Sequence, residues 1–216
     1  MPKIVDPEQR RTEIIHGLWA VIYEHGIHAV TYQAVAQAAG VSVGRIQHYF
    51  DSKQDLVHAG CRAMVGAAAE AHEQRADSLE PLEALTELLL QPIPRSDAFR
   101  LGSAVWYVYL AQTVADPQIA EIIGGASRET LEYATSLLRS AGAPAPAHEA
   151  ARLVALSNGL AQSVLIGALS PDRATEILGS EVASLRTAVD STDAGAGRSE
   201  PSAPSTPSAR KSSAQE

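Results

Sequence analysis

Residues 31–53, TYQAVAQAAGVSVGRIQHYFDSK, constrain the fold of this chain more than any other stretch. Thr31 can cap a first short helix, because its hydroxyl accepts a backbone N–H that the first turn leaves unpaired. Gly40 stands where helices commonly end in a left-handed residue, and Ser42 can cap a second helix. The pattern therefore predicts two short helices joined at a glycine hinge, with a third helix starting near Lys53.

The second of these helices has an apolar side and a polar side. At about 100° per residue, Ile46 and Phe50 fall together and should face the core, which leaves the opposite side exposed. A short exposed helix of this kind suits the major groove of DNA. The residues expected to face the bases are Val43, Gly44, Arg45 and Gln47. Those expected to contact phosphates are Thr31, Tyr32, Ser42, His48, Tyr49 and Lys53. For the hairpin alone, the alternative is a helical hairpin with a glycine hinge and no other role. For each of these residues taken singly, the alternative is a solvated helix face.

These motifs resemble the TetR-type bacterial transcriptional repressors. The resemblance covers roughly residues 10–62 and rests on Tyr23-Glu-His-Gly26, Thr31, Val35 to Ser42, Gly44, His48-Tyr49-Phe50 and Ser52-Lys53. It implies a homodimer that binds a near-palindromic operator in double-stranded DNA and is released by a small-molecule effector. Many members carry a tyrosine where this chain has Gln47, so the operator sequence cannot be inferred from a relative.

The composition, and the positions of proline and glycine along the chain, predict an all-α protein of about nine helices. Hydrophobic residues make up 45% of the chain and aromatic residues only 5%, and no segment alternates as a strand. We expect a three-helix DNA-binding domain with the helix-turn-helix over 1–51 and a larger helical ligand-binding and dimerisation domain over 52–189. Residues 190–216 lack Val, Ile, Leu, Met and aromatic side chains, which predicts a disordered Ser/Ala/Pro-rich tail. Beyond the hairpin, helices are expected near 53–78, 81–90, 95–115, 117–141, 147–169 and 172–189.

Aromatic side chains gather in the middle of the chain, where the resemblance places an effector cavity. Aromatic rings with a few polar groups suit a drug-sized or cationic molecule. The predicted pocket residues are Phe99, Ser103, Trp106, Tyr107, Tyr109, Gln112, Thr113 and Tyr133. For any single one of them, core packing is the alternative. The stretch from Trp106 to Pro117 is also similar to the ligand domain of members related to the choline-responsive repressor, a similarity that names no ligand here.

The last two predicted helices each carry an apolar stripe at helical spacing. Two such helices from each of two subunits would close a four-helix interface, and the family pairs in this way. The residues expected at the interface are Leu156, Leu160, Val164, Leu165, Leu178, Val182 and Leu185. The alternative is that both are ordinary core helices of one subunit.

Net charge alone argues against a nucleic-acid partner, because the chain carries a formal charge of −8. Residues 1–62, however, hold six basic and six acidic side chains, so the acidic surplus lies elsewhere. DNA binding would depend on a few well-placed cations and on two modules acting together. Arg10 and Arg11 could add phosphate contacts, or could be solvated beside Glu8 and Glu13.

Other function classes find little support in the sequence. There is no phosphate-binding loop, nucleophile elbow or pair of histidines at metal spacing, so we expect no enzyme, no cofactor and no metal. No run of about 18 apolar residues indicates a membrane span, and the start lacks the apolar core of a signal peptide, which favours a cytoplasmic protein. The remaining rival is a helical module that binds a small molecule or a protein without sequence-specific DNA binding.

Overall fold

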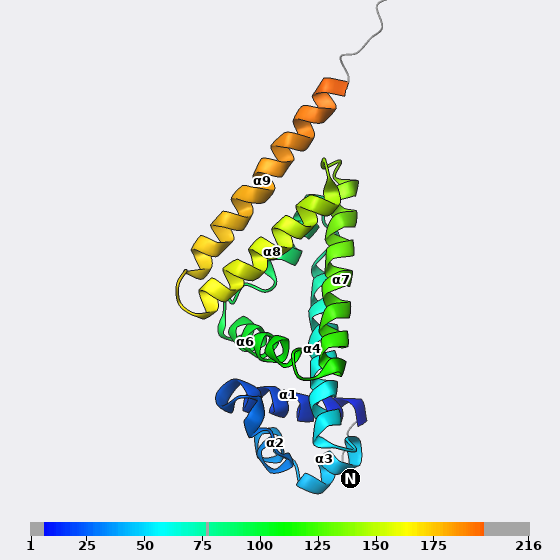
Figure 1. Ribbon diagram of the computed structural model, residues 1–216, viewed down its shortest axis with the longest axis vertical. Coiled ribbons are helices and arrows are strands. Elements are labelled where there is room, and N and C mark those ends of the chain that lie inside the picture. Colours follow the sequence, from blue (N-terminus) through cyan, green and yellow to red (C-terminus); the bar gives the residue numbers. More distant parts are fainter. Residues whose placement is uncertain (1–6, 77, 197–216) are drawn as a thin grey trace, which may run out of the picture.

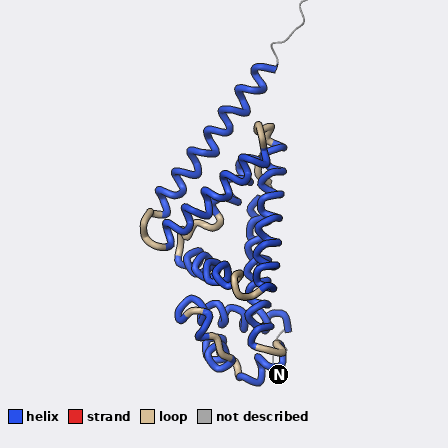
Figure 2. Tube along the Cα trace, in the orientation of Figure 1, coloured by secondary structure: helices blue, strands red, loops and turns tan. Residues whose placement is uncertain are grey.

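The computed structural model describes residues 7–76 and 78–196, and this part of the chain contains helices, turns and loops without strands (Figure 2). The all-α prediction and the number of helices are confirmed. The described residues form α1 (Pro7–His25), a 3-10 turn η1 (Ile27–Ala29), α2 (Tyr32–Ala39), α3 (Val43–Tyr49), α4 (Lys53–Ala76), α5 (Pro81–Leu90), α6 (Asp97–Gln112), α7 (Pro117–Ser140), α8 (Pro146–Leu165) and α9 (Pro171–Ala196).

Several helix ends follow directly from local sequence. Pro81 and Pro117 each begin a helix, where the fixed φ of proline suits the first turn and its missing N–H costs nothing. Asp116 caps α7 by accepting the N–H groups of Gln118 at 3.0 Å and Ile119 at 3.2 Å. Proline and the residue before it therefore define where α7 starts.

Two helices end earlier than predicted. α6 was expected to run to Ala115 but ends at Gln112, and the next three residues form a turn. Pro117 restricts the residue before it to extended backbone, so the chain has to leave the helix ahead of it. α8 was expected to reach Leu169 but ends at Leu165, because Gly167 adopts a left-handed φ of 76°.

The last helix is longer than predicted. α9 continues to Ala196, whereas the sequence placed its end at residue 189 and a disordered tail from residue 190. Beyond residue 189 the sequence has no Val, Ile, Leu, Met or aromatic residue, but each further residue of a preformed helix still gains a backbone hydrogen bond. The remainder of the predicted tail, 197–216, lies outside the described residues.

The first three helices pack around one apolar core. α1 crosses α2 closely, and a Cβ added at Gly17 would lie 2.7 Å from the Cβ of Ala39 and 2.9 Å from its backbone nitrogen. Only a glycine permits this approach. The fully buried side chains around the crossing are Ile14, Leu18, Val35, Ile46 and Leu56, with Ile22 and Phe50 almost as buried.

This core extends across the predicted domain boundary at residues 51 and 52. Val105 and Tyr109 of α6 and Ile119 of α7 belong to the same buried cluster as the residues of α1 to α3. The indole N–H of Trp19 donates to the Gly60 carbonyl at 3.2 Å, and the Tyr109 hydroxyl donates to the Val57 carbonyl at 3.2 Å. The first turns of α4 are thus held both by α1 and by α6.

A second apolar core joins α5, α7, α8 and α9. Figure 1 shows α4 and α7 side by side and α8 and α9 as an antiparallel pair. α1 to α3 lie together at the end of the molecule that is farthest from the C-terminal end of α9. α4 therefore connects the small N-terminal module to the larger helical part. Among the described helices, none is both long and apolar enough to cross a membrane.

Candidate functional site

The short helix α3 presents the surface that the sequence assigned to DNA. Its Ile46 and its C-terminal neighbour Phe50 are 0% and 1% exposed, so they anchor the helix on the core. The four residues predicted to face the bases are all exposed, and nothing lies within 4 Å of a Cβ placed at Gly44: Val43, Gly44, Arg45 and Gln47. Figure 1 places α3 at the end of the molecule away from α9.

Both predicted caps are present. The Thr31 hydroxyl accepts the N–H of Ala34 at 3.0 Å, and the Ser42 hydroxyl accepts the N–H of Arg45 at 3.2 Å. Gly40 ends α2 in the left-handed region with φ 63°. The two hydroxyls therefore hold the helix starts and still have a proton to donate to a phosphate oxygen.

The remaining residues predicted to contact phosphates differ in their exposure and in their hydrogen bonds. His48 is exposed, and its ring lies edge-on to that of Tyr49, with 5.2 Å between centroids. Lys53 is exposed at the first residue of α4. The Tyr32 hydroxyl points inward instead and donates to the Phe50 carbonyl at 3.5 Å, at the outer limit of a hydrogen bond.

Two cations at or next to α3 have no carboxylate partner. Arg45 and Lys53 form no ion pair with any carboxylate in the described ranges. Ion pairs are formed, in contrast, by Arg62 and Arg75 of α4, Arg152 of α8 and Arg173 of α9. A cation without a carboxylate partner keeps its full attraction for phosphate. Both are therefore available to a phosphate despite the acidic balance of the whole chain.

Arg11 has a role that the sequence reasoning missed. Its guanidinium donates to the carbonyl of Tyr49 at 3.2 Å and lies over the Phe50 ring, 4.5 Å from its centroid. It is therefore neither solvated nor directed only at a phosphate. The contact joins residues 38 apart in sequence, and no local pattern predicts such a pairing.

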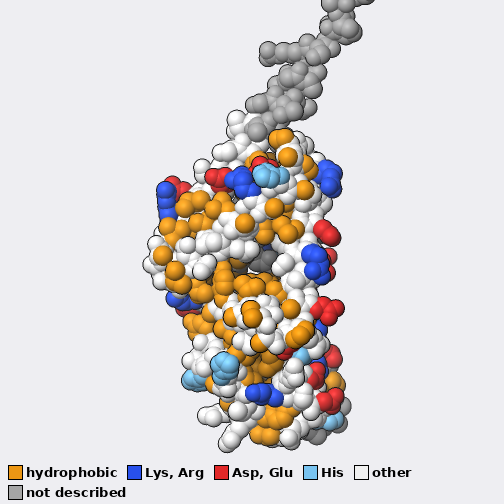
Figure 3. Space-filling model, in the orientation of Figure 1, with side chains coloured by type: hydrophobic (Ala, Val, Ile, Leu, Met, Phe, Trp, Pro, Cys, Tyr) orange, Lys and Arg blue, Asp and Glu red, His pale blue; other side chains and the backbone are white. Residues whose placement is uncertain are grey.

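The predicted effector residues of α6 do not all share one space. Ser103 donates to the Pro92 carbonyl and Tyr107 to the Asn158 carbonyl, both at 2.8 Å, which ties α6 to the preceding loop and to α8. Burial raises the pKa of the Tyr107 hydroxyl. Figure 3 shows this face of the molecule hollowed between α8 and α6, with hydrophobic side chains around the hollow.

The other predicted pocket residues lie elsewhere. Tyr109 is fully buried in the core that α6 shares with the N-terminal module, and Trp106 packs against the same core. Phe99 lies under Arg95, with 5.3 Å to its centroid, and the Thr113 hydroxyl donates to its own helix. A prediction based on chain position therefore mixes core residues with residues that could meet a ligand.

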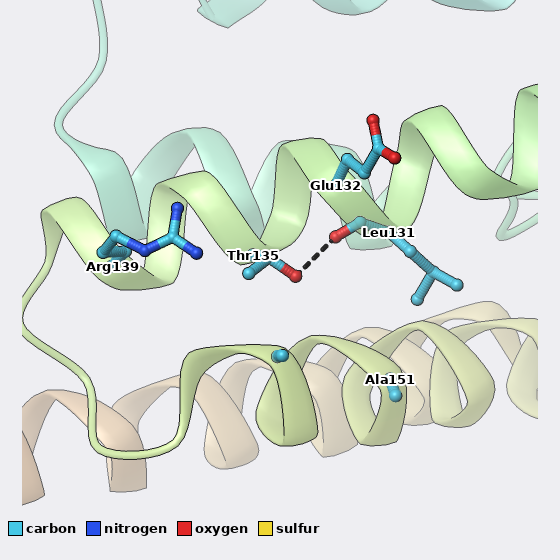
Figure 4. A pocket seen from close by; sticks show the side chains of 6 residues that line it. Leu131, Glu132, Thr135, Arg139 and Ala151 are labelled. Carbon is cyan, nitrogen blue, oxygen red and sulfur yellow. Dashed lines mark hydrogen bonds between the residues drawn. The ribbon is translucent and has the colours of Figure 1, made fainter.

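Two shallow grooves open on the described surface. One, of about 350 Å³, lies between α7 and α8 and contains none of the predicted pocket residues (Figure 4); its lining comprises Leu131, Glu132, Thr135, Arg139, Ala147 and Ala151. The other, of about 300 Å³, lies where η1, α4 and the α6–α7 turn meet, and Gln112 and Lys53 both line it. No three His, Cys, Asp or Glu side chains converge on a metal position within the described ranges.

His72 of α4 stacks edge-on against Tyr133 of α7, with 5.3 Å between the ring centroids. Its side chain is 6% exposed, and neither ring nitrogen has a hydrogen-bond partner among the described protein groups. Burial lowers the pKa of this imidazole, and the nearby Arg75 lowers it further against an opposing contribution from Glu87. The folded protein therefore favours the neutral ring.

His72→Leu should make the protein more stable in mild acid. Because the imidazole pKa is lower in the folded than in the unfolded state, the unfolded state binds more protons and stability falls as the pH drops below about 6.5. The leucine removes this loss and a buried polar group, so the free energy of unfolding near pH 6 should rise by about 1 kcal/mol. Denaturant titrations at pH 6 and pH 8 check this. A variant with the unchanged pH dependence of the original protein would contradict it.

The apolar stripes predicted to form the dimer interface are buried within one subunit. Leu178 is 0% exposed and Val164 3% exposed, and both belong to the second core with Leu160, Val182 and Leu185. Leu156 and Leu165 are half-buried. The five buried side chains are therefore already covered within the subunit, whereas Leu156 and Leu165 keep part of their surface exposed. Their place at a dimer interface stays a prediction.

Two protein-family models match this chain, one in its N-terminal module and one in its larger helical part. The model described as bacterial regulatory proteins, tetR family, matches residues 14–59, and that described as BetI-type transcriptional repressor, C-terminal, matches residues 81–187. The HTH-type transcriptional regulator BetI of Escherichia coli O45:K1 is 31% identical over 166 residues, which cover 74% of this chain and 84% of that protein. These matches span both the N-terminal module and the larger helical part.

Other matches are partial or distant in sequence. The regulator PksA of Bacillus subtilis is 29% identical over 112 residues, so the aligned part covers 51% of this chain and 55% of that relative. A solved structure of a regulator from Saccharomonospora viridis in complex with choline has a TM-score of 0.73 at 23% identity and covers 80% of this chain and 95% of that one. The relatives are transcriptional regulators, which confirms the expectation that the chain is not an enzyme.

Proposed function

The chain belongs to the TetR family of bacterial transcriptional regulators, and from this membership we propose that it is a repressor that binds a near-palindromic operator as a homodimer. Binding of a small molecule in the larger helical part releases the DNA. Operator binding assigns its activity to the cytoplasm, where bacterial DNA is found.

One observation carries the proposal. Ile46 and Phe50 anchor α3 on the core of the N-terminal module, and Ser42 caps its first turn. The side chains of Arg45 and Gln47 are exposed on its outer side. Arginine can bind guanine and glutamine can bind adenine through paired hydrogen bonds in the major groove. A rigid helix with such side chains can distinguish base pairs.

The outer faces of α8 and α9 support the homodimer. Their buried faces are occupied within the subunit, but the exposed side of α8 carries small residues one turn apart at Ala151, Ala155 and Gly159. The exposed side of α9 carries Gly179 and Ala183 in the same way. Small side chains let helices from two subunits cross closely.

Ala183→Arg is expected to split the dimer without unfolding the subunit. The side chain is exposed in the single subunit, so a long cation is tolerated there, but it cannot be buried between two closely packed helices. Light scattering should give the mass of one chain, and operator affinity should fall with it. Ala98→Arg, at an exposed site in the first turn of α6, is the control and should stay dimeric. A dimeric Ala183→Arg variant would exclude this face.

The α6–α7 turn is the proposed connection between effector and DNA. His58 Nε2 of α4 lies 2.7 Å from Oδ2 of Asp116, the residue that caps α7. Burial by itself raises the pKa of the Asp116 carboxyl, but the hydrogen bonds from His58 and from the N–H groups of Ile119 and Gln118 lower it overall. Movement of α6 or α7 around a ligand would therefore reach the start of α4, directly after α3.

Choline is the first effector to test, because a structural neighbour was solved with it. Loss of operator binding on adding choline would support an effector of this class. If operator binding stayed unchanged at a choline concentration high enough to saturate a choline site, choline would be rejected as the effector. Other small molecules would then be tested.

Selection from a random pool of duplex DNA tests the proposed function itself. At moderate salt, the protein should enrich one sequence with two related halves. Failure to enrich any sequence would overturn the repressor proposal in favour of the helical binding module without sequence-specific DNA binding.

A further inference from the structure

The recognition helix α3 is short and needs support at both ends. It has 7 residues and packs mainly against α2. Its start is held by the Ser42 cap, whereas the carbonyl groups of its last turn have no partner further along the helix. Two side chains from other helices supply donors there: Arg11 of α1 to the Tyr49 carbonyl and Tyr32 of α2 to the Phe50 carbonyl.

Arg11 contributes more than a hydrogen bond at this end. Its guanidinium lies 4.5 Å from the centroid of Phe50, a ring that is 1% exposed. A planar cation can stack on a ring and donate sideways at the same time, which lysine cannot do equally well. A positive charge beside the C-terminal carbonyls also favours the helix dipole.

We propose that Arg11 is a positioning residue for DNA recognition. It fixes the tilt of α3 and so determines how well α3 distinguishes base pairs, although Arg11 itself contacts no base. The inference rests on the proposed function, since it concerns how the same surface binds its operator. Breaking the contact would leave α3 anchored by Ile46 and Phe50, but it would remove the donor to the Tyr49 carbonyl and the cation over the Phe50 ring, so the C-terminal end of α3 could tilt further. A tilted helix still meets phosphates, so discrimination falls more than general affinity.

Arg10 provides a matched control in the adjacent position. It carries the same charge, but it pairs with Glu13 on its own helix and makes no hydrogen bond or ion pair to α3 within the described ranges. Arg10→Met and Arg11→Met therefore remove the same charge from the same helix. Only Arg11→Met removes the link from α1 to α3.

The test measures the ratio of affinities for the selected operator and for a random duplex, over a series of salt concentrations. Arg11→Met should lower this ratio by about tenfold, the effect of losing a charge-assisted hydrogen bond that orients the helix. Arg10→Met should change the ratio by less than about twofold. Arg11→Lys, which keeps the charge but not the planar group, should recover only part of the loss. Circular dichroism at the assay temperature confirms that each variant is folded.

Two results would overturn the inference. If Arg11→Met lowered both affinities equally and reduced the salt slope by about one, Arg11 would be a phosphate contact. If it lowered only the melting temperature and left the ratio unchanged, its role would be purely structural. Both results presuppose that the original protein selects an operator; if it selects none, the proposed function has failed and not this inference alone.

Discussion

Replacing Arg45 and Gln47 together with alanine is expected to abolish discrimination between the operator and random DNA. Both side chains are exposed on the outer face of α3, and Arg45 forms no ion pair among the described residues. Each paired contact to a base is worth about 1–3 kcal/mol, so operator affinity should fall by about 100-fold or more. Affinity for random duplexes should fall by much less, because phosphate contacts elsewhere remain. Titration of both duplexes at one salt concentration measures the two effects.

A matched double substitution shows whether position or mere loss of charge is responsible. Arg128→Ala with Gln74→Ala removes the same two side-chain types from exposed positions on α7 and near the C-terminal end of α4, remote from α3. This control should retain full discrimination. Undiminished operator affinity in the Arg45 and Gln47 double variant would instead mean that another surface reads the bases.

Gly17→Ala is expected to destabilise the N-terminal module severely. The new Cβ would lie 2.7 Å from the Ala39 Cβ and 2.9 Å from the Ala39 nitrogen, and the latter is backbone that cannot rotate away. α2 would have to move off α1, and overpacking of this kind costs about 1–3 kcal/mol or more. Operator binding should weaken as well, because α3 packs on α2. Chemical denaturation and operator titration together check both effects.

Gly102→Ala separates this steric effect from helix propensity. Gly102 is also inside a helix, but nothing lies within 4 Å of an added Cβ. Alanine should therefore stabilise the protein by about 0.5–1 kcal/mol, the usual gain over glycine in a helix. If both variants gained stability, the close crossing of α1 and α2 would not be essential to the module.

Features set by neighbouring residues could be predicted from the sequence. Thr31 and Ser42 cap α2 and α3 as expected, because a cap depends on a hydroxyl and a few backbone groups nearby. Gly40 has the left-handed φ that a hinge needs. The exposed and buried sides of α3 likewise follow from the helical period, which is why the sequence could predict, residue by residue, which side chains of α3 are exposed.

Features set by tertiary contacts could not be predicted in the same way. The stripe through Leu178 indicates that one side of α9 is buried, but not whether its own subunit or a partner covers it. The aromatic Tyr109 fills a core with α1 and α4 rather than a cavity. Arg11 reaches a carbonyl 38 residues away. Each depends on how helices meet, which spacing along one helix does not determine.

In the proposed complex, two copies of α3, held at a fixed separation, bind two halves of one operator. The most direct measurement compares the affinity for the selected operator with that for a copy carrying about five extra base pairs at its centre, half a turn of DNA. The insertion rotates one half-site to the opposite side of the duplex, so affinity should fall close to that of a single half-site. Equal affinity for both duplexes would contradict the claim, because each module would then bind independently.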